Sequence, residues 1–167
     1  TALRGIAEVH AIWYRRAEEL MQLPLIATPP SAANMTSMAE LWEELGRHAF
    51  EEFPEWFSAE DLQAQQNLVR TIPDWWSEIE SLPMTLIHND FNPRNIALRG
   101  RNGSSRLCAY DWELATAHLP QHDLAELLCF VLTPGCDRDE VDRYVEIHRR
   151  ALEEASGYAI EPKSWRR

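Results

Sequence analysis

The chain has 167 residues, of which 45% are apolar and 26% charged, and its formal net charge at pH 7 is −11. This length and composition fit one globular domain with a sizeable core. The excess of acidic residues argues against nucleic acid or an anionic membrane as partner, because both require basic patches. The three cysteines show no CxxC spacing, no apolar run could cross a bilayer and no secretory signal is visible, so we expect a cytoplasmic protein.

Apolar residues at helical spacing predict that the chain opens with one long helix over residues 2–21. Residues 23–36 contain three prolines and several small residues, which favour a connector. Ser37 and Glu40 have the spacing of a capping box, so a second helix is expected to begin at Ser37. Pro54 should end that helix, because proline cannot continue it.

Two further helices are predicted, one from Ser58 to about Ile72 and a short one that Pro73 opens. The pattern then changes to three short β-prone runs, at residues 85–87, 96–98 and 107–110. Asn102-Gly103 lies between the second and third runs and is a strong signal for a hairpin turn.

Helical periodicity returns after Pro120 and again over residues 138–156, with Gly157 placed to end the last helix. The order along the chain is therefore helices, a small β unit, and helices. We expect an α+β fold that is mainly α-helical, with a small β-hairpin unit that carries the functional loop.

Polar side chains gather where two of the predicted strands end. A loop with Asp90 and Asn95 follows the strand that ends at Ile87, and the hairpin returns the chain to Asp111 at the end of another strand. Two carboxylates and one amide suit a hard cation such as Mg²⁺, which binds through a few protein oxygens together with substrate phosphates. Phosphoryl transfer also needs a carboxylate that accepts the proton of the attacking hydroxyl. We expect Asp90 to be this catalytic base and Asn95 and Asp111 to hold the metal.

The spacing His88-x-Asp90-x-x-x-x-Asn95, followed by an Asp-Trp-Glu triplet at Asp111, resembles the aminoglycoside phosphotransferase and choline kinase superfamily. The resemblance implies a protein-kinase-like fold, of which this chain is the C-terminal lobe. It also implies transfer of the γ-phosphate of ATP to a hydroxyl group of a small molecule, with ATP and Mg²⁺ as cofactors. Acceptors of the aminoglycoside type and of the choline or ethanolamine type both stay open.

Two further matches support the resemblance. Residues 9–13 look like the helix that opens the C-terminal lobe in this superfamily, and residues 122–125 look like the Asp-Leu-Ala motif that follows its metal-binding aspartate. By this resemblance, Asp123 braces the catalytic loop and His88 packs beneath it, both as structural support of the site.

Two charged residues lie beside the predicted metal ligands in the sequence, and each has two interpretations. Arg94 either touches a phosphate or covers a nearby carboxylate. Glu113 either supports the metal from behind its ligands or pairs with a neighbouring side chain.

The chain departs from the superfamily in one respect. The N-terminal lobe of the superfamily holds a glycine-rich or equivalent loop and a lysine that meets the ATP phosphates. Neither has a counterpart here, and the only lysine is Lys163. We therefore expect residues 1–167 to form the C-terminal lobe alone, with an N-terminal ATP-clamping lobe as its partner. On its own, this lobe should bind ATP poorly and be inactive.

The segment Met38–Leu82 carries eleven Asp or Glu residues against two arginines, a balance of −9, together with seven aromatic residues. Carboxylates beside aromatic faces suit a cationic amine, and in the superfamily the helices inserted at this place help to form the acceptor site. The substrate-binding candidates are Glu43, Trp42, Trp75 and Trp76. Ordinary amphipathic helices with aromatic cores would give the same composition.

Two other functions compete with the kinase hypothesis. A metal-dependent phosphohydrolase would use His88, His118, His122 and Asp123. The strand-and-hairpin context of Asp90 speaks against it, since such sites usually place their ligands on helices. The other hypothesis is a non-catalytic interaction module derived from a kinase, against which the intact loop residues argue.

Overall fold

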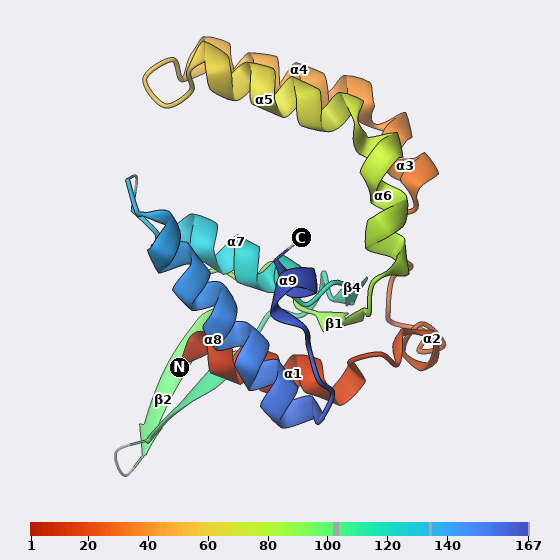
Figure 1. Ribbon diagram of the computed structural model, residues 1–167, viewed down its shortest axis with the longest axis vertical. Coiled ribbons are helices and arrows are strands. Elements are labelled where there is room, and N and C mark those ends of the chain that lie inside the picture. Colours follow the sequence, from red (N-terminus) through yellow and green to blue (C-terminus); the bar gives the residue numbers. More distant parts are fainter. Residues whose placement is uncertain (102–103, 134, 167) are drawn as a thin grey trace. The chain divides into compact units, whose positions relative to one another are not determined.

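A computed structural model describes residues 1–101, 104–133 and 135–166 of the chain (Figure 1). The fold is α+β and mainly helical, as the sequence predicts, and the strands of the described part form two small antiparallel sheets. The chain divides into two compact units. Unit 1 comprises Thr1–Pro29 and Pro83–Arg167, and unit 2 comprises Pro30–Leu82.

Unit 1 begins with helix α1 (Ala2–Trp13), which buries one apolar face at helical spacing. The helix ends at Trp13, so the predicted continuation to residue 21 is wrong. Arg15 adopts a left-handed backbone conformation with φ 64°, and its N–H donates a hydrogen bond to the carbonyl of Met84 at 3.0 Å. This contact turns the chain before the short helix α2 (Ala17–Leu20) begins.

Helix α1 packs along α8 (Arg138–Ser156), and Figure 1 shows the two helices side by side. It also shares a hydrophobic cluster with α7 (Gln121–Val131) and with the fully buried Phe91. The members of this cluster are Leu3, Ile6, Phe91, Leu124, Leu127 and Leu128. Full burial of a side chain of this size contributes about 1.5–3 kcal/mol, so Phe91 anchors its loop firmly on the core.

Four strands lie in the described part of unit 1. They are β1 (Thr85–Ile87), β2 (Ile96–Arg101), β3 (Ser104–Ala109) and β4 (Thr116–His118). β1 pairs antiparallel with β4, and β2 pairs antiparallel with β3. The three predicted β-prone runs all form strands, whereas β4 has no predicted counterpart, because Thr-Ala-His lacks the apolar β-prone residues that mark the other runs. The predicted turn at Asn102-Gly103 lies outside the described residues.

The chain leaves and re-enters unit 1 beside β4. Ala27 forms an isolated parallel bridge with Thr116, and Ile87 of β1 pairs with the same threonine. The hydroxyl of Thr116 also donates a hydrogen bond to the carbonyl of Ala27 at 2.9 Å. Both chain segments that flank unit 2 are therefore held on one short strand.

Helix α1 and β3 approach each other closely at Gly5. A β-carbon at this position would overlap the β-carbon of Leu107 on β3. Glycine is therefore needed here because two elements pack closely, and not because the backbone adopts an unusual angle.

Unit 2 consists of the helices α3 (Ala32–Ser37), α4 (Ala39–Glu52), α5 (Ala59–Arg70) and α6 (Ile72–Ser81). The capping box predicted at Ser37 and Glu40 is wrong, because Ser37 is the last residue of α3 and its hydroxyl donates to the carbonyl of Asn34. Ser31 and Asn34 form a capping box instead, and it starts a helix within the predicted connector. Ser58 caps α5, as predicted.

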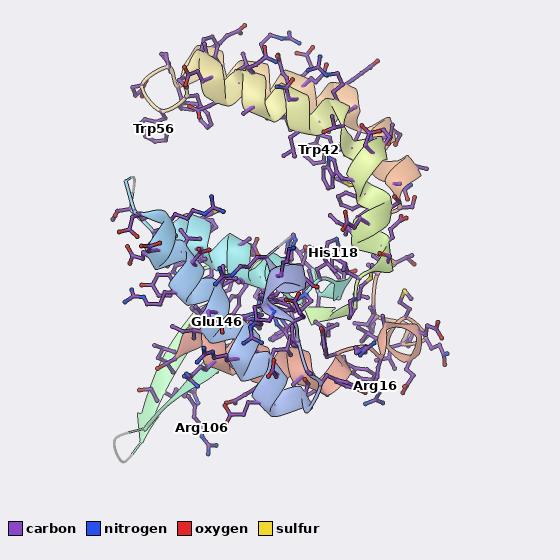
Figure 2. All side chains as sticks on the ribbon, viewed as in Figure 1. Arg16, Trp42, Trp56, Arg106, His118 and Glu146 are labelled. Carbon is purple, nitrogen blue, oxygen red and sulfur yellow. The ribbon has the colours of Figure 1, made fainter. Side chains whose placement is uncertain are left out.

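The C-terminal part of unit 1 is fixed by a buried arginine. Helix α8 ends where predicted, and Gly157 follows it with φ 73°. Beyond this point, the guanidinium of Arg149 donates to the carbonyl of Ile160 at 2.6 Å and pairs with Glu146, which is labelled in Figure 2, on its own helix. The segment then forms α9 (Pro162–Trp165), which is too short for a sequence pattern to predict. Within the described ranges, no helix is long and apolar enough to span a membrane.

A chain of buried polar side chains links α8, α1 and α7. Nε2 of His148 lies 3.2 Å from Nδ1 of His10, and Nε2 of His10 lies 3.0 Å from Oδ2 of Asp123, and all three side chains are fully buried. Nδ1 of His148 has no partner among the described atoms, so we assign it as the bare nitrogen of a neutral ring. His148 then donates to His10, and His10 donates to Asp123.

This arrangement makes stability depend on pH. Burial, with a smaller contribution from His10, lowers the pKa of His148 to about 3, and burial lowers the pKa of His118 to about 4. Both rings titrate at 6.5 when unperturbed, so acid protonates the unfolded chain first and stability falls as the pH drops below that value. Burial raises the pKa of Asp123, but the hydrogen bonds from His10 and from backbone N–H groups outweigh burial and hold the pKa below its usual value. Asp123 therefore also makes stability fall as the pH drops, over a lower pH range.

We expect the free energy of unfolding to fall between pH 6.5 and pH 4, with His148 contributing at most about 1.4 kcal/mol per pH unit. His148→Phe removes this titrating group and should flatten the slope, whereas His48→Phe, at an exposed position, should not. Urea unfolding at a series of pH values measures the slopes. Equal slopes for wild type and His148→Phe would contradict the assignment of a buried neutral ring.

Gly5→Ala should lower the free energy of unfolding by about 1–3 kcal/mol, because the added methyl overpacks the contact with Leu107. Gly100→Ala on β2 is the matched control. The methyl added there meets only the hydroxyl of Ser105, at an ordinary contact distance of 4.0 Å. Since glycine inside a strand weakens it, this second variant should be neutral or stabilising. Chemical denaturation distinguishes the two, and equal effects would refute the packing argument.

Candidate functional site

The loop between β1 and β2 holds Asp90 against Asn95. Nδ2 of Asn95 donates to the Asp90 carboxylate at 2.6 Å and to the Asp90 carbonyl at 3.0 Å. Both partners can only accept, so the orientation of the amide is unambiguous. Asn95 is 9% exposed and Asp90 is half-buried. The amide oxygen of Asn95 is therefore turned away from Asp90 and is left for another partner.

A second amide, which the sequence analysis missed, holds the other oxygen of Asp90. Nδ2 of Asn92 donates to Oδ1 of Asp90 at 2.7 Å, and its own Oδ1 accepts the N–H of Arg94 at 3.0 Å. Asn92 is 1% exposed. An asparagine that accepts a hydrogen bond from the backbone two residues later forms an Asx turn, and the Asn-Pro pair in the sequence is a signal for such a turn.

Asp111 follows β3 and is bracketed by contacts with the loop. The N–H of Tyr110 donates to the carbonyl of Asn95 at 3.0 Å, and the carbonyl of Tyr110 accepts from His88 Nε2 at 2.9 Å. On the other side, Nδ2 of Asn89 donates to the carbonyl of Leu114 at 3.1 Å. Asp111 itself is exposed and has φ 66°, a conformation that aspartate tolerates better than most residues. The hairpin thus brings Asp111 to the loop that carries Asp90 and Asn95.

His88 supports this arrangement from below. Its ring is fully buried and lies 4.6 Å from the ring of Trp112 and 5.9 Å from that of Phe91, measured between centroids. Nδ1 has no partner among the described atoms, and Nε2 is used by Tyr110. The ring is therefore packed and oriented as a structural residue would be.

Helix α7 holds the start of the loop through Asp123. Oδ2 of Asp123 accepts the N–H of His88 at 2.8 Å, and Oδ1 accepts the N–H of Asn89 at 3.0 Å. Oδ2 also accepts the bond from His10 described above. Asn89 has φ 62°, so the loop turns through a left-handed residue directly beside this carboxylate.

One turn along α7, a second carboxylate meets the loop. Oε2 of the half-buried Glu126 accepts the N–H of Phe91 at 2.6 Å. No motif singles out Glu126. The signal that could have found it is its spacing, because residues three apart share a helix face and Glu126 follows Asp123 by three.

The donors left by this geometry fit a hard cation. The amide oxygen of Asn95 and the carboxylate of Asp111 are oxygen donors, and Mg²⁺ is held by few protein oxygens together with water and phosphates. No group of three or more His, Cys, Asp or Glu side chains in the described ranges is arranged to hold a metal ion. Glu113 and Arg94 are both exposed, and their two interpretations each stay open.

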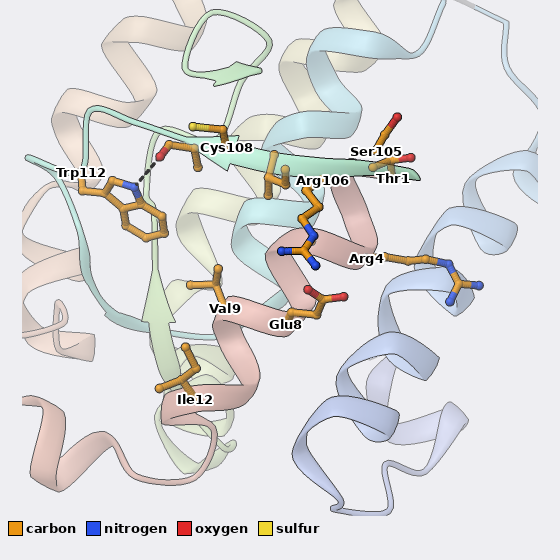
Figure 3. A pocket seen from close by; sticks show the side chains of 12 residues that line it. Thr1, Arg4, Glu8, Val9, Ile12, Ser105, Arg106, Cys108 and Trp112 are labelled. Atoms are coloured by element: carbon orange, nitrogen blue, oxygen red, sulfur yellow. Dashed lines mark hydrogen bonds between the residues drawn. The ribbon is translucent and has the colours of Figure 1, made fainter. Parts of the chain in front are cut away.

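An open hollow of about 810 Å³ lies between α1 and β3 (Figure 3). Ile12 of α1 and Arg106 of β3 line it, and Trp112 lies at one end, where its Nε1 donates to the carbonyl of Ala109 at 3.1 Å. None of the predicted catalytic or metal-binding residues is among the described residues that line the hollow.

The four substrate-binding candidates all belong to unit 2. Trp76 is 7% exposed, sits in the hydrophobic cluster of that unit and donates from Nε1 to the carbonyl of Pro30. Trp42 (labelled in Figure 2) and Trp75 pack against the same cluster and are half-buried, whereas Glu43 is exposed. The tryptophans thus have a packing role, which is the alternative that the sequence left open, and a role in substrate binding stays a prediction.

Comparisons with known proteins agree with the resemblance seen in the motifs. A model of the phosphotransferase enzyme family matches residues 3–159, which include the loop, Asp111 and Asp123. No curated protein matches the chain, and no solved structure does. The family match covers nearly the whole chain and confirms the predicted superfamily. The chain belongs to the phosphotransferase enzyme family.

Proposed function

We propose that this chain is the catalytic and substrate-binding lobe of a protein-kinase-like enzyme that transfers the γ-phosphate of ATP to a hydroxyl group of a small molecule. The observation that carries the proposal is the environment of Asp90. Its carboxylate is held by the amides of Asn92 and Asn95, and the loop that presents it contacts the segment carrying Asp111. A base, an amide oxygen and a second carboxylate are protein groups that phosphoryl transfer uses on the side of the acceptor and the metal.

Asp90 acts as the base in this proposal. Each of its oxygens receives one amide N–H, and a carboxylate oxygen has lone pairs for more than one donor. The acceptor hydroxyl donates to Asp90 and is oriented by it. As the hydroxyl oxygen bonds to the γ-phosphorus, its proton passes to Asp90 and the bond from that phosphorus to the leaving ADP oxygen breaks.

Asn95 and Asp111 hold the metal in this proposal. Bound Mg²⁺ supplies positive charge beside the phosphates of ATP. Because Nδ2 of Asn95 faces Asp90, the same side chain offers its amide oxygen to the cation while keeping the base in place. Asp111, which is exposed, offers its carboxylate.

An N-terminal lobe outside residues 1–167 completes the proposed enzyme. The chain has a single lysine, Lys163 on α9, and no glycine-rich stretch, so the groups that clamp ATP phosphates in this type of enzyme come from elsewhere. The isolated lobe should therefore bind ATP more weakly than the intact protein. Titration of both with ATP and Mg²⁺ tests this, and equal affinity would refute the need for a second lobe.

A phosphohydrolase built on His88, His118, His122 and Asp123 has less support. Asp123 directs both oxygens at backbone N–H groups, and His88 is engaged with a carbonyl group. Tracing the label of γ-³²P-ATP in the intact protein distinguishes the hypotheses. Label in the acceptor supports the kinase, label only in inorganic phosphate supports the hydrolase, and no release of label supports an interaction module.

Asp90→Asn in the intact protein should lower kcat by about 10²–10⁴-fold, because the isosteric amide cannot accept the proton. Asp139→Asn, an exposed position in the first turn of α8, is the control and should leave kcat unchanged. Thermal unfolding of both variants checks the fold. Undiminished phosphoryl transfer by folded Asp90→Asn would refute the assignment of the base.

We further propose that the acceptor is cationic, because the exposed Glu43 and other carboxylates give Met38–Leu82 a balance of −9. A screen of aminoglycosides, choline, ethanolamine and neutral sugars against the intact protein should find turnover among the amines. Glu43→Gln should raise KM for a cationic acceptor, whereas Glu154→Gln, exposed on α8, should not. Turnover of neutral or anionic alcohols alone would exclude the cationic acceptor.

A further inference from the structure

We infer that Glu126 is a positioning residue for Asp90, which acts through the backbone N–H of Phe91. This inference rests on the proposed function in one respect only, the role of Asp90 as the base. The evidence is the contact between Oε2 of Glu126 and the N–H of Phe91 at 2.6 Å, together with what surrounds it.

Helix α7 meets the loop with two carboxylates on one face. Asp123 accepts the N–H groups of His88 and Asn89, which precede the base, and Glu126 accepts the N–H of Phe91, which follows it. The backbone is therefore held on both sides of Asp90. Leucines of α7 pack in the same core cluster as Phe91. The two carboxylates therefore attach the loop backbone to a helix that is itself fixed in the core.

The contact of Glu126 fixes one particular peptide group. The N–H of Phe91 belongs to the peptide that joins it to Asp90, and the carbonyl of this peptide accepts from the N–H of Asn92 and from Nδ2 of Asn95, both at 3.0 Å. Both polar groups of this peptide are thus held: Glu126 accepts from its N–H, and loop residues donate to its C=O. Holding this plane fixes the backbone of Asp90, and with it the direction of the proposed base.

Two physical properties make a glutamate suited to this position. An ionised carboxylate accepts from a backbone N–H roughly twice as strongly as a neutral acceptor does. In addition, the ring of Phe91 is fully buried in the core, so both the side chain and the backbone of this residue are held. Loss of Glu126 would leave the ring in place and free the N–H side of the peptide group, which would then be held only through its carbonyl.

The test uses the intact protein, Mg²⁺-ATP and the acceptor that the screen identifies. Glu126→Ala should lower kcat by up to about 100-fold, as expected for a base displaced by about 1 Å, with KM for ATP unchanged. Glu126→Gln keeps an acceptor oxygen at the same reach and should restore most of the loss. Glu154→Ala on α8 is the control and should match wild type. An unchanged kcat for Glu126→Ala, or a Glu126→Gln variant as impaired as Glu126→Ala, would overturn the inference.

A second measurement needs no substrate. Amide hydrogen exchange followed by NMR should show faster exchange at Phe91 in Glu126→Ala, with Asn89 unchanged because Asp123 still holds it. Unchanged exchange at Phe91 would overturn the inference. If the alanine variant fails to fold, Glu126→Asp, which is one methylene shorter, takes its place. Absence of phosphoryl transfer in wild type would refute the proposed function, while the exchange data would still decide whether Glu126 holds the loop.

Discussion

The buried carboxylate of Asp123 is the interaction on which the rest of unit 1 depends. A carboxylate removed from water is costly unless donors surround it, and here it receives three hydrogen bonds, from His10 and from the N–H groups of His88 and Asn89. One donor comes from α1 and two from the loop, so the same group joins the packing of the helices to the conformation of the loop. His148 extends the connection to α8.

The site gains precision because each of its polar groups has more than one task. Asn95 holds Asp90 with its nitrogen and turns its oxygen away, toward the proposed cation, and Asn92 holds the other carboxylate oxygen while closing a turn with Arg94. His88 supports the loop and orients the carbonyl next to Asp111. Sites on well-supported backbone are more precise than sites on unsupported loops. The loop between β1 and β2 contains no regular secondary structure, but its side-chain and backbone hydrogen bonds support it in the same way.

Sequence patterns predicted the parts of this molecule that depend on local spacing. The long helix α8 with Gly157, the hairpin strands and the Ser58 cap are of this kind, and so is the clustering of loop residues at strand ends. The failures depend on contacts between distant segments. Helix α1 stops because Arg15 meets Met84, and Glu126 matters because of where Phe91 lies. The spacing of Glu126 from Asp123 indicates a shared helix face, but it does not indicate Phe91 as the partner, and no spacing indicates Met84 as the partner of Arg15.

The bridge from Ala27 to Thr116, and the pairing of Ile87 with the same residue, have a consequence for how such enzymes diversify. A segment whose two ends are fastened to one strand can be lengthened, shortened or exchanged without disturbing the framework that bears it. Residues 30–82 form such a segment. The helices of this segment could therefore be resized or exchanged as one unit, because both of its ends stay fastened to the same strand.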